Sequence, residues 1–184
     1  MNKRSLLLLN AALLFSLAGC ASLSKDECLS GNWEEIGVRD GANGKPEEYL
    51  IEHTTACAKL NVVPDRGAWN HGRERGLERF CQPNRMYNIG EYGGGFDVGI
   101  CRNFDQERLT DAYEKGREVH YRAGILDEID AEARSIRTRL ENKEEKEISR
   151  KERDAMIYRL GQLEYQRLEA VESLDRARRR ARDL

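Results

Sequence analysis

Cysteine is the residue type in this sequence best able to do chemistry, and the five cysteines fall into two groups. Cys20 stands apart, directly after an apolar N-terminal run. The other four are Cys28, Cys57, Cys81 and Cys101, an even set that suits two disulfides if the chain folds in an oxidising compartment. Zinc is the rival chemistry, but no two of these cysteines have the two-residue spacing of a zinc site. The histidines also lie in no ligand-like cluster: His53, His71 and His120. We therefore expect disulfides and no metal.

The N-terminus predicts export and lipid attachment. Lys3 and Arg4 precede an apolar run from Leu6 to Phe15 that is too short to span a bilayer. The run leads into Leu-Ala-Gly-Cys at residues 17–20, which resembles the lipobox of bacterial lipoproteins. That resemblance implies a signal peptide over residues 1–19, a diacylglycerol on the Cys20 thiol and a further acyl chain such as palmitate on its amine. An ordinary cleaved signal with an incidental cysteine is the alternative.

The same resemblance implies a destination. The second mature residue is Ala21 rather than Asp, which in lipoproteins of this type implies sorting to the outer membrane, usually to its periplasmic face. Lipid chains would hold the protein on the membrane. Residues 20–27 are then expected to form a lipidated linker.

The chain also repeats itself, and the repeat bears on the disulfide pairing. Seven residues separate Cys28 from an Ile-Gly pair, and seven separate Cys81 from another. Eleven residues separate Cys57 from a Trp, and eleven separate Cys101 from a Tyr; a Gly-Arg-Glu string follows each aromatic residue. Four cysteines allow three pairings. If each unit folds with its own bridge, the pairs are Cys28–Cys57 and Cys81–Cys101, although a chance match of short glycine-rich strings is the alternative.

An ordered set of glycines, aromatic residues and cysteines resembles a family of bacterial lipoproteins known as domain of unknown function 2799. The residues that carry it are Trp33, Ile36, Gly37, Asp40, Gly41, Gly44, Cys57, the stretch 69–76, Cys81, Pro83, Gly90, Cys101 and the stretch 113–117. The resemblance covers residues 28–121 and implies no activity, cofactor or catalytic residue. The second unit departs from the first, because Glu91 and Tyr92 precede its later glycines.

Local signals predict a helical module over residues 28–121. Asn32 is a suitable N-cap for a helix over 33–41, and a turn follows at 44–45. Pro46 suits the first position of a helix to about residue 60, and another helix should run from 64–65 to about residue 80. The glycine run 93–95 predicts a loop.

Glycines four residues apart would place bare backbone on one helix stripe, where a neighbouring helix can approach closely. Aromatic and basic residues accompany these glycines, so we consider them candidates for packing or for ligand contact, with packing the favoured role: Trp33, Trp69, Arg73, Tyr113 and Arg117.

Residues 122–184 predict a long charged helical hairpin or coiled coil. Leu126, Ile129, Ala133, Ile136 and Leu140 step by three and four residues, which is a heptad pattern. The pattern lapses at 142–147 and resumes with Met156, Leu160, Leu163, Leu168, Val171 and Leu174. Ser149 and Glu152 form a possible capping box for the second helix. One continuous rod is the alternative to a hairpin.

The sequence predicts no enzyme and no cofactor. A Gly-x-Ser-x-Gly elbow is missing from the sequence, and His71 with Glu74 or His120 with Glu118 are more simply explained as solvated helix faces. Nucleic acid is an unsuitable partner for an exported chain with a net charge of -2. An arginine cluster at 176–182 suits the helix dipole, with anionic lipid as the alternative.

Two functional hypotheses follow. The first is a non-enzymatic envelope lipoprotein, mainly α-helical, whose C-terminal helices serve self-association or bind an envelope protein. The alternative is a small periplasmic ligand-binding or inhibitory module with a site between the two repeated units.

Overall fold

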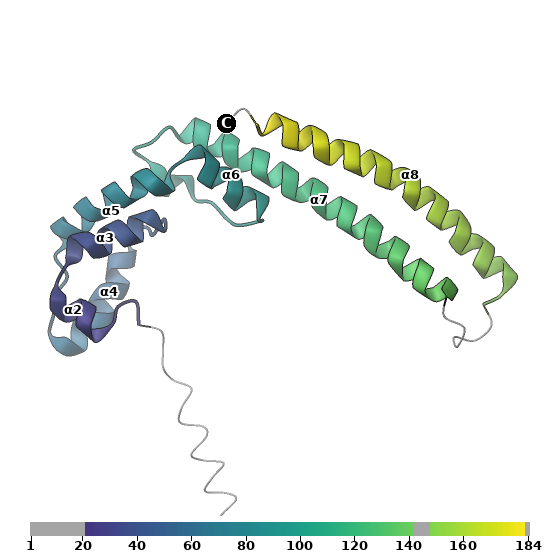
Figure 1. Cartoon of the computed structure of the whole chain (residues 1–184). Coiled ribbons are helices and arrows are strands. Elements are labelled where there is room, and N and C mark those ends of the chain that lie inside the picture. Colours follow the sequence, from purple (N-terminus) through teal and green to yellow (C-terminus); the bar gives the residue numbers. More distant parts are fainter. Residues whose placement is uncertain (1–20, 142–147, 183–184) are drawn as a thin grey trace, which may run out of the picture. The chain divides into compact units, whose positions relative to one another are not determined.

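A computed structural model describes residues 21–141 and 148–182, and those residues form helices and no strands. They belong to two compact units (Figure 1), one ending at Glu78 and the other starting at Arg79. The division falls between the two repeated units of the sequence. The second repeated unit therefore shares its compact unit with the C-terminal helices.

The first unit consists of short helices. They are α2 (Lys25–Ser30), α3 (Trp33–Ala42), α4 (Tyr49–Cys57), the 3₁₀ turn η1 (Ala58–Leu60) and α5 (Arg66–Phe80), whose last two residues belong to the second unit. Helix α3 begins at Trp33, as predicted, but α4 begins later than predicted. Pro46 precedes α4 in a turn in which the Tyr49 amide donates to the Pro46 carbonyl oxygen at 3.1 Å.

Helix α2 begins with a capping box that the sequence analysis overlooked. The Glu27 amide donates to Ser24 Oγ at 3.2 Å, and the Ser24 amide donates to Glu27 Oε2 at 2.8 Å. Arg39 of α3 adds an ion pair to the same carboxylate. The hydrogen bond from Arg39, together with those from Ser24, lowers the pKa of Glu27 to about 2. Ser24-x-x-Glu27 was the sequence signal for this helix.

Helices α3 and α5 approach so closely that their backbones touch. A Cβ atom added at Gly37 would overlap the Trp69 carbonyl oxygen, and one added at Gly72 would overlap the Glu34 carbonyl oxygen. Only glycine fits at these two points. The glycines four residues apart therefore serve helix packing here.

The core of the first unit lies around its disulfide. Cys28 is bonded to Cys57, with Cα atoms 5.6 Å apart, in agreement with the pairing that the repeat predicts. Besides the two cysteines, the buried apolar side chains that pack there are Leu23, Trp33, Ile36, Leu50 and Trp69.

The second unit repeats this arrangement before extending it. It holds α6 (Pro83–Glu91), η2 (Val98–Cys101), α7 (Gln106–Glu141) and α8 (Arg150–Arg180). Cys81 is bonded to Cys101, with Cα atoms 5.8 Å apart. A Cβ atom at Gly90 would overlap the Tyr113 carbonyl oxygen, and one at Gly116 would overlap the Tyr87 carbonyl oxygen. These contacts correspond one by one to those between α3 and α5, which supports a true duplication.

Helices α7 and α8 run antiparallel as a hairpin (Figure 1). The Arg159 guanidinium donates to both Glu132 oxygens, from Nε at 2.7 Å and from Nη2 at 2.8 Å. Arg167 contacts Asp130 at 2.9 Å, so Asp130 pairs with the facing helix. The predicted capping box opens α8, because the Glu152 amide donates to Ser149 Oγ at 3.3 Å. The hairpin, and not the continuous rod, is thus the observed form; the predicted lapse at 142–147 lies outside the described residues.

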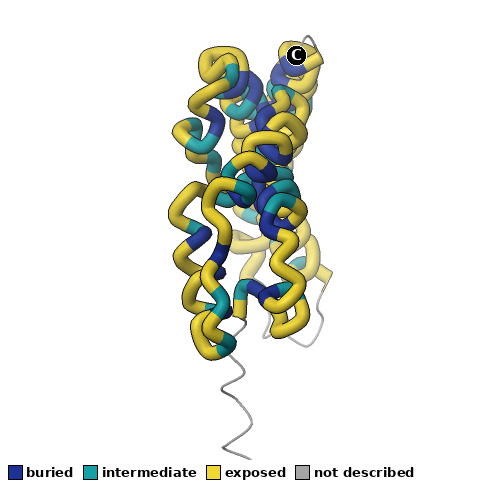
Figure 2. Tube along the Cα trace, turned by 90° about the vertical axis from the view of Figure 1, so that its left-hand side faces the viewer, coloured by how far each residue is buried: buried dark blue, intermediate teal, exposed yellow. Residues whose placement is uncertain are grey.

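The register of α8 differs from the predicted one in its second half. Leu163, Ala170, Leu174 and Ala177 are buried, whereas Leu168 is 64% exposed. The buried residues of α8 follow one another by seven, four and three residues, so Leu168, two residues before Ala170, falls on the opposite face. In Figure 2, buried residues recur along the tubes between exposed ones, as amphipathic helices packed on one side require.

Candidate functional site

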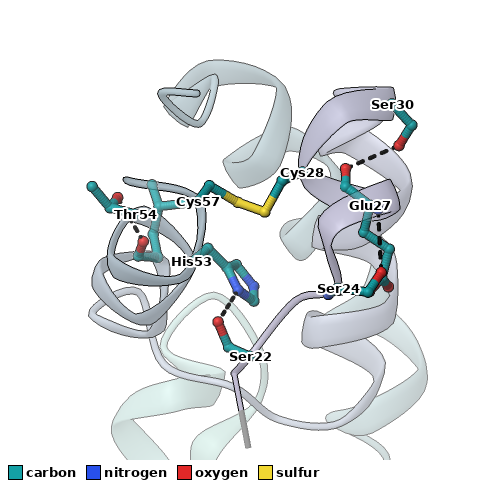
Figure 3. The surroundings of a disulfide bond; sticks show 9 residues. Ser22, Ser24, Glu27, Cys28, Ser30, His53, Thr54 and Cys57 are labelled. Carbon is teal, nitrogen blue, oxygen red and sulfur yellow. Dashed lines mark hydrogen bonds between the residues drawn. A yellow bond between two sulfur atoms is a disulfide. The ribbon is translucent and has the colours of Figure 1, made fainter. Parts of the chain in front are cut away.

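A chain of hydrogen-bonded side chains crosses the first unit. Ser22 Oγ lies 2.9 Å from His53 Nδ1 (Figure 3), and His53 Nε2 lies 2.6 Å from Asp40 Oδ2. Trp69 Nε1 donates to the same Asp40 oxygen at 2.8 Å. Ser22 lies before α2, and the other three residues lie in three helices: Asp40 in α3, His53 in α4 and Trp69 in α5. The network therefore joins the N-terminal segment to these three helices.

Three members of the network are buried, and Ser22 is half-buried. The His53 side chain is fully buried, Trp69 is fully buried, and Asp40 is 5% exposed. The Tyr49 and Trp69 rings both meet the His53 ring edge to face, with centroids 5.0 and 6.3 Å away. Among the described residues, every buried side-chain nitrogen and oxygen has a hydrogen-bond partner. A carboxylate oxygen accepts, so Asp40 Oδ2 takes hydrogen bonds from both the His53 ring and the Trp69 indole.

The order serine–histidine–aspartate is also that of a hydrolase triad. A triad histidine must exchange a proton with bound substrate, however, and the His53 ring is fully enclosed. The Asp40 oxygen that holds His53 also holds Trp69. The geometry therefore suits a clasp that fixes the N-terminal segment to the helices.

The clasp starts immediately after the predicted lipidation site. Ser22 is hydrogen-bonded to His53, and Leu23 is 4% exposed within the core. Ala21 alone separates Ser22 from Cys20. The linker expected over residues 20–27 is thus folded from Ser22 onward, and it includes the start of α2.

The predicted packing or ligand residues fall in two equivalent pairs and one single residue. Arg73 lies over the Trp69 ring at 5.9 Å in the first unit, and Arg117 lies over the Tyr113 ring at 6.0 Å in the second. Trp33 is 6% exposed at the start of α3, in the core.

The two pairs differ in accessibility. Arg73 is 4% exposed, and its Nε donates to the Lys45 carbonyl oxygen at 2.7 Å. Arg117 is exposed, and Tyr113, which is half-buried, donates from its hydroxyl to the Gly94 carbonyl oxygen at 3.0 Å. Trp69 and Arg73 therefore serve the interior of the first unit.

The histidines considered for acid–base chemistry lie elsewhere. His71 contacts Glu34 at 3.3 Å on an exposed surface, and His120 Nδ1 lies 3.0 Å from the Glu91 carbonyl oxygen. Glu118 pairs with Arg122 at 2.8 Å. The structure shows neither His71 with Glu74 nor His120 with Glu118 as a contacting pair.

The buried network belongs to the first unit only. By the repeat, Gly93 stands where Asp40 stands, and Asp97 stands where His53 stands. Asp97 caps η2, since its side chain accepts from the Gly99 amide at 2.8 Å. The two copies have therefore kept the glycine crossing and the disulfide but not the polar network.

Sequence reasoning missed Ser22 and His53 and noted Asp40 only as part of the family pattern. No local spacing relates these residues, so the sequence offered no signal for the network. Within the described residues, no group of histidine, cysteine and carboxylate side chains could hold a metal ion. In the same part of the chain, every helix is too short or too polar to cross a bilayer.

Comparison with known proteins supports the family resemblance. No match was found among curated proteins or among solved structures. Residues 32–118, which include most of both repeated units, match the family described as "Protein of unknown function (DUF2799)", and this segment is therefore similar to that family.

Proposed function

We propose that this protein is a lipid-anchored envelope protein that acts by protein–protein interaction and not by catalysis. The observation that carries the proposal is the α7–α8 hairpin. Helix α7 alone is about 54 Å long at 1.5 Å per residue. Its pairing with α8 leaves the outer side of α8 open to partners, and a long helical surface of this kind suits recognition of another helix.

The N-terminal clasp supports the anchoring part of the proposal. The lipobox resemblance implies lipid on Cys20, and Ser22 and Leu23 belong to the folded unit. Lipid on Cys20 would therefore hold the first unit at the membrane surface without a flexible tether. The periplasmic face of the outer membrane is the location that the residue after Cys20 supports.

The alternative, a binding module with a site at Trp69, Arg73, Tyr113 and Arg117, has less support. A ligand cannot reach the ring of Trp69 or the guanidinium of Arg73 without opening the first unit, because both are buried.

Fatty-acid labelling tests the anchoring. Cells that express the full chain are fed a clickable fatty acid, and the chain is recovered from separated inner-membrane, outer-membrane and soluble fractions. We expect label and outer-membrane recovery for the natural chain, and neither for Cys20→Ala. An unlabelled natural chain in the cytosol would overturn the proposal.

Photo-crosslinking in intact cells tests the interaction. A photoreactive residue is placed at Tyr158 of α8, which is 70% exposed, and at Leu29 of α2, which is 57% exposed, as a matched position. We expect a discrete adduct from position 158 and none of comparable yield from position 29. Equal, diffuse adducts from both positions would count against a role for the hairpin.

A further inference from the structure

Helix α8 carries a second apolar stripe, on the side that faces away from α7. Its members are strongly exposed: Ile157 is 55%, Tyr158 70%, Tyr165 66% and Leu168 64% exposed. With Gly161 they recur at three- and four-residue steps. At about 100° per residue, they fall within one face opposite Leu163, Ala170 and Leu174 of the buried seam. Such a stripe has no partner in the hairpin itself.

The stripe is hollowed at its centre. A shallow groove of about 590 Å³ is lined by Ile157, Tyr158, Gly161, Gln162 and Tyr165, among others. A side chain at Gly161 would meet nothing within 4 Å. The groove is therefore open at Gly161, where no side chain covers the helix backbone, and a second helix could lie close to it.

The charges at the two ends of the stripe are of opposite sign. Arg150 and Lys151 lie eleven and ten residues before Gly161, and Glu169 and Glu172 lie eight and eleven residues after it; Glu172 also pairs with Arg176 of the same helix at 3.4 Å. An identical helix that crosses antiparallel at Gly161 would place its acidic end against the basic end of the first. A parallel copy would place like charges together, which is unfavourable.

The apolar residues fit the same arrangement. Ile157 lies four residues before Gly161 and Tyr165 four residues after it, so each Ile157 would face the Tyr165 of the other copy. Asp154 is the one charged residue within the stripe and would lie near Leu168 at the rim, where water can reach it.

We propose that the outer face of α8 binds a second copy of this chain, antiparallel, with the two-fold axis close to Gly161. The contact is isologous, so it closes at a dimer. This inference rests on the proposed function only in treating the hairpin as an interaction surface, and it identifies the partner.

Engineered cysteines test the geometry in membranes that contain the full chain. Gly161→Cys, Ile157→Cys and Tyr165→Cys chains with two distinguishable tags are treated with a short bismaleimide; the disulfide-bonded cysteines do not react. The dimer predicts a 161–161 product and a mixed 157–165 product, with little 157–157 product. Strong 157–157 and weak 157–165 products would indicate a parallel pair and overturn the proposal, as would products that contain only a different protein.

Two tyrosines provide the matched control. Tyr165→Glu places a charge in the stripe, whereas Tyr121→Glu places one at a tyrosine of α7 that is 60% exposed. We expect the 161–161 yield to fall at least tenfold with Tyr165→Glu and to stay unchanged with Tyr121→Glu. Equal yields from both would overturn the proposal. If the chain carries the fatty-acid label but gives no cross-linked dimer, the dimer is refuted and the anchoring stands. If the chain gives the dimer but carries no label, the anchoring is refuted and the dimer stands.

Discussion

At the scale of single residues, Asp40 joins two helices and the N-terminal segment to its own helix. One of its oxygens accepts from both His53 Nε2 and Trp69 Nε1 in a buried setting. His53 in turn contacts Ser22, so Asp40 indirectly fixes the first residues of the folded chain. A buried donor that loses its acceptor costs about 1–3 kcal/mol, because its hydration is not regained.

Asp40→Ala should therefore lower the free energy of unfolding of the first unit by roughly 2–6 kcal/mol, since two donors lose one acceptor. Urea unfolding followed by tryptophan fluorescence measures this, because both tryptophans, Trp33 and Trp69, lie in that unit. Asp127→Ala, at an exposed position of α7, is the control and should change the value by less than about 0.5 kcal/mol. Equal effects from the two variants would refute the role given to Asp40.

The Glu27 carboxylate gives the first unit a pH dependence. Its pKa in the folded chain is lowered from 4.5 to about 2, mainly by the hydrogen bond from Arg39. A carboxylate with a lowered pKa stabilises the fold above its unfolded pKa, and this contribution is lost as the pH falls through the folded pKa. The relevant window is therefore pH 4.5 down to 2.

Glu27→Gln should lower the melting temperature relative to the natural chain at pH 7, and the difference should shrink between pH 4.5 and 2. Thermal unfolding followed by tryptophan fluorescence at several pH values checks this. A difference that stays constant down to pH 2 would show that the lost stability does not come from the ionised carboxylate.

At the scale of elements, one helix crossing is used twice. Helices α3 and α5 meet at glycines, and α6 and α7 meet in the same way. Each crossing is accompanied by one disulfide. The repeated element is therefore a pair of helices in backbone contact with a covalent bridge beside it, and α7 extends the second copy into the hairpin.

Gly72→Ala should destabilise the first unit, because the added methyl group would overlap the Glu34 carbonyl oxygen and force the helices apart. Overpacking of this kind typically costs about 1–3 kcal/mol. Gly124→Ala in α7 is the matched control: nothing lies within 4 Å of the added carbon, so higher helix propensity should stabilise α7 by roughly 0.5–1 kcal/mol. Chemical unfolding of both variants measures the two changes, which should have opposite signs.

At the scale of the whole molecule, the unfolding of the two units can be followed by different optical signals, tryptophan fluorescence and circular dichroism. The tryptophans report on the first unit. Helices α7 and α8, with 36 and 31 residues, make the second unit the larger source of helical circular dichroism. A bridge that closes a loop of 20 to 30 residues stabilises by on the order of 3 kcal/mol in the chain-entropy model.

Removal of each disulfide should therefore affect a different signal. The double variant Cys28→Ala/Cys57→Ala should lower the midpoint of the tryptophan transition. The double variant Cys81→Ala/Cys101→Ala should mainly lower the midpoint of the circular dichroism transition at 222 nm. Identical shifts of both signals in both variants would mean that the molecule unfolds as one cooperative body.

Much of the fold follows from local features of the sequence. The spacing of cysteines, glycines and aromatic residues predicted both disulfide pairs, and the Ser149–Glu152 capping box predicted the start of α8. The cap depends on residues a few positions apart, and the disulfide pairs followed from the internal repeat of the sequence. Pro46 misled the prediction, since a proline before a helix fits a preceding turn as well as the first helical position.

Only the tertiary structure decided how the helices meet and which polar groups they bring together. Ser22, Asp40, His53 and Trp69 come from four segments, and their network exists because the close crossing of α3 and α5 and the Cys28–Cys57 bridge place those segments around one point. The pairing of Asp130 with Arg167 and the outward position of Leu168 likewise depend on the register between α7 and α8. Periodicity states which residues share a helix face, and only the packed neighbour determines which face is buried.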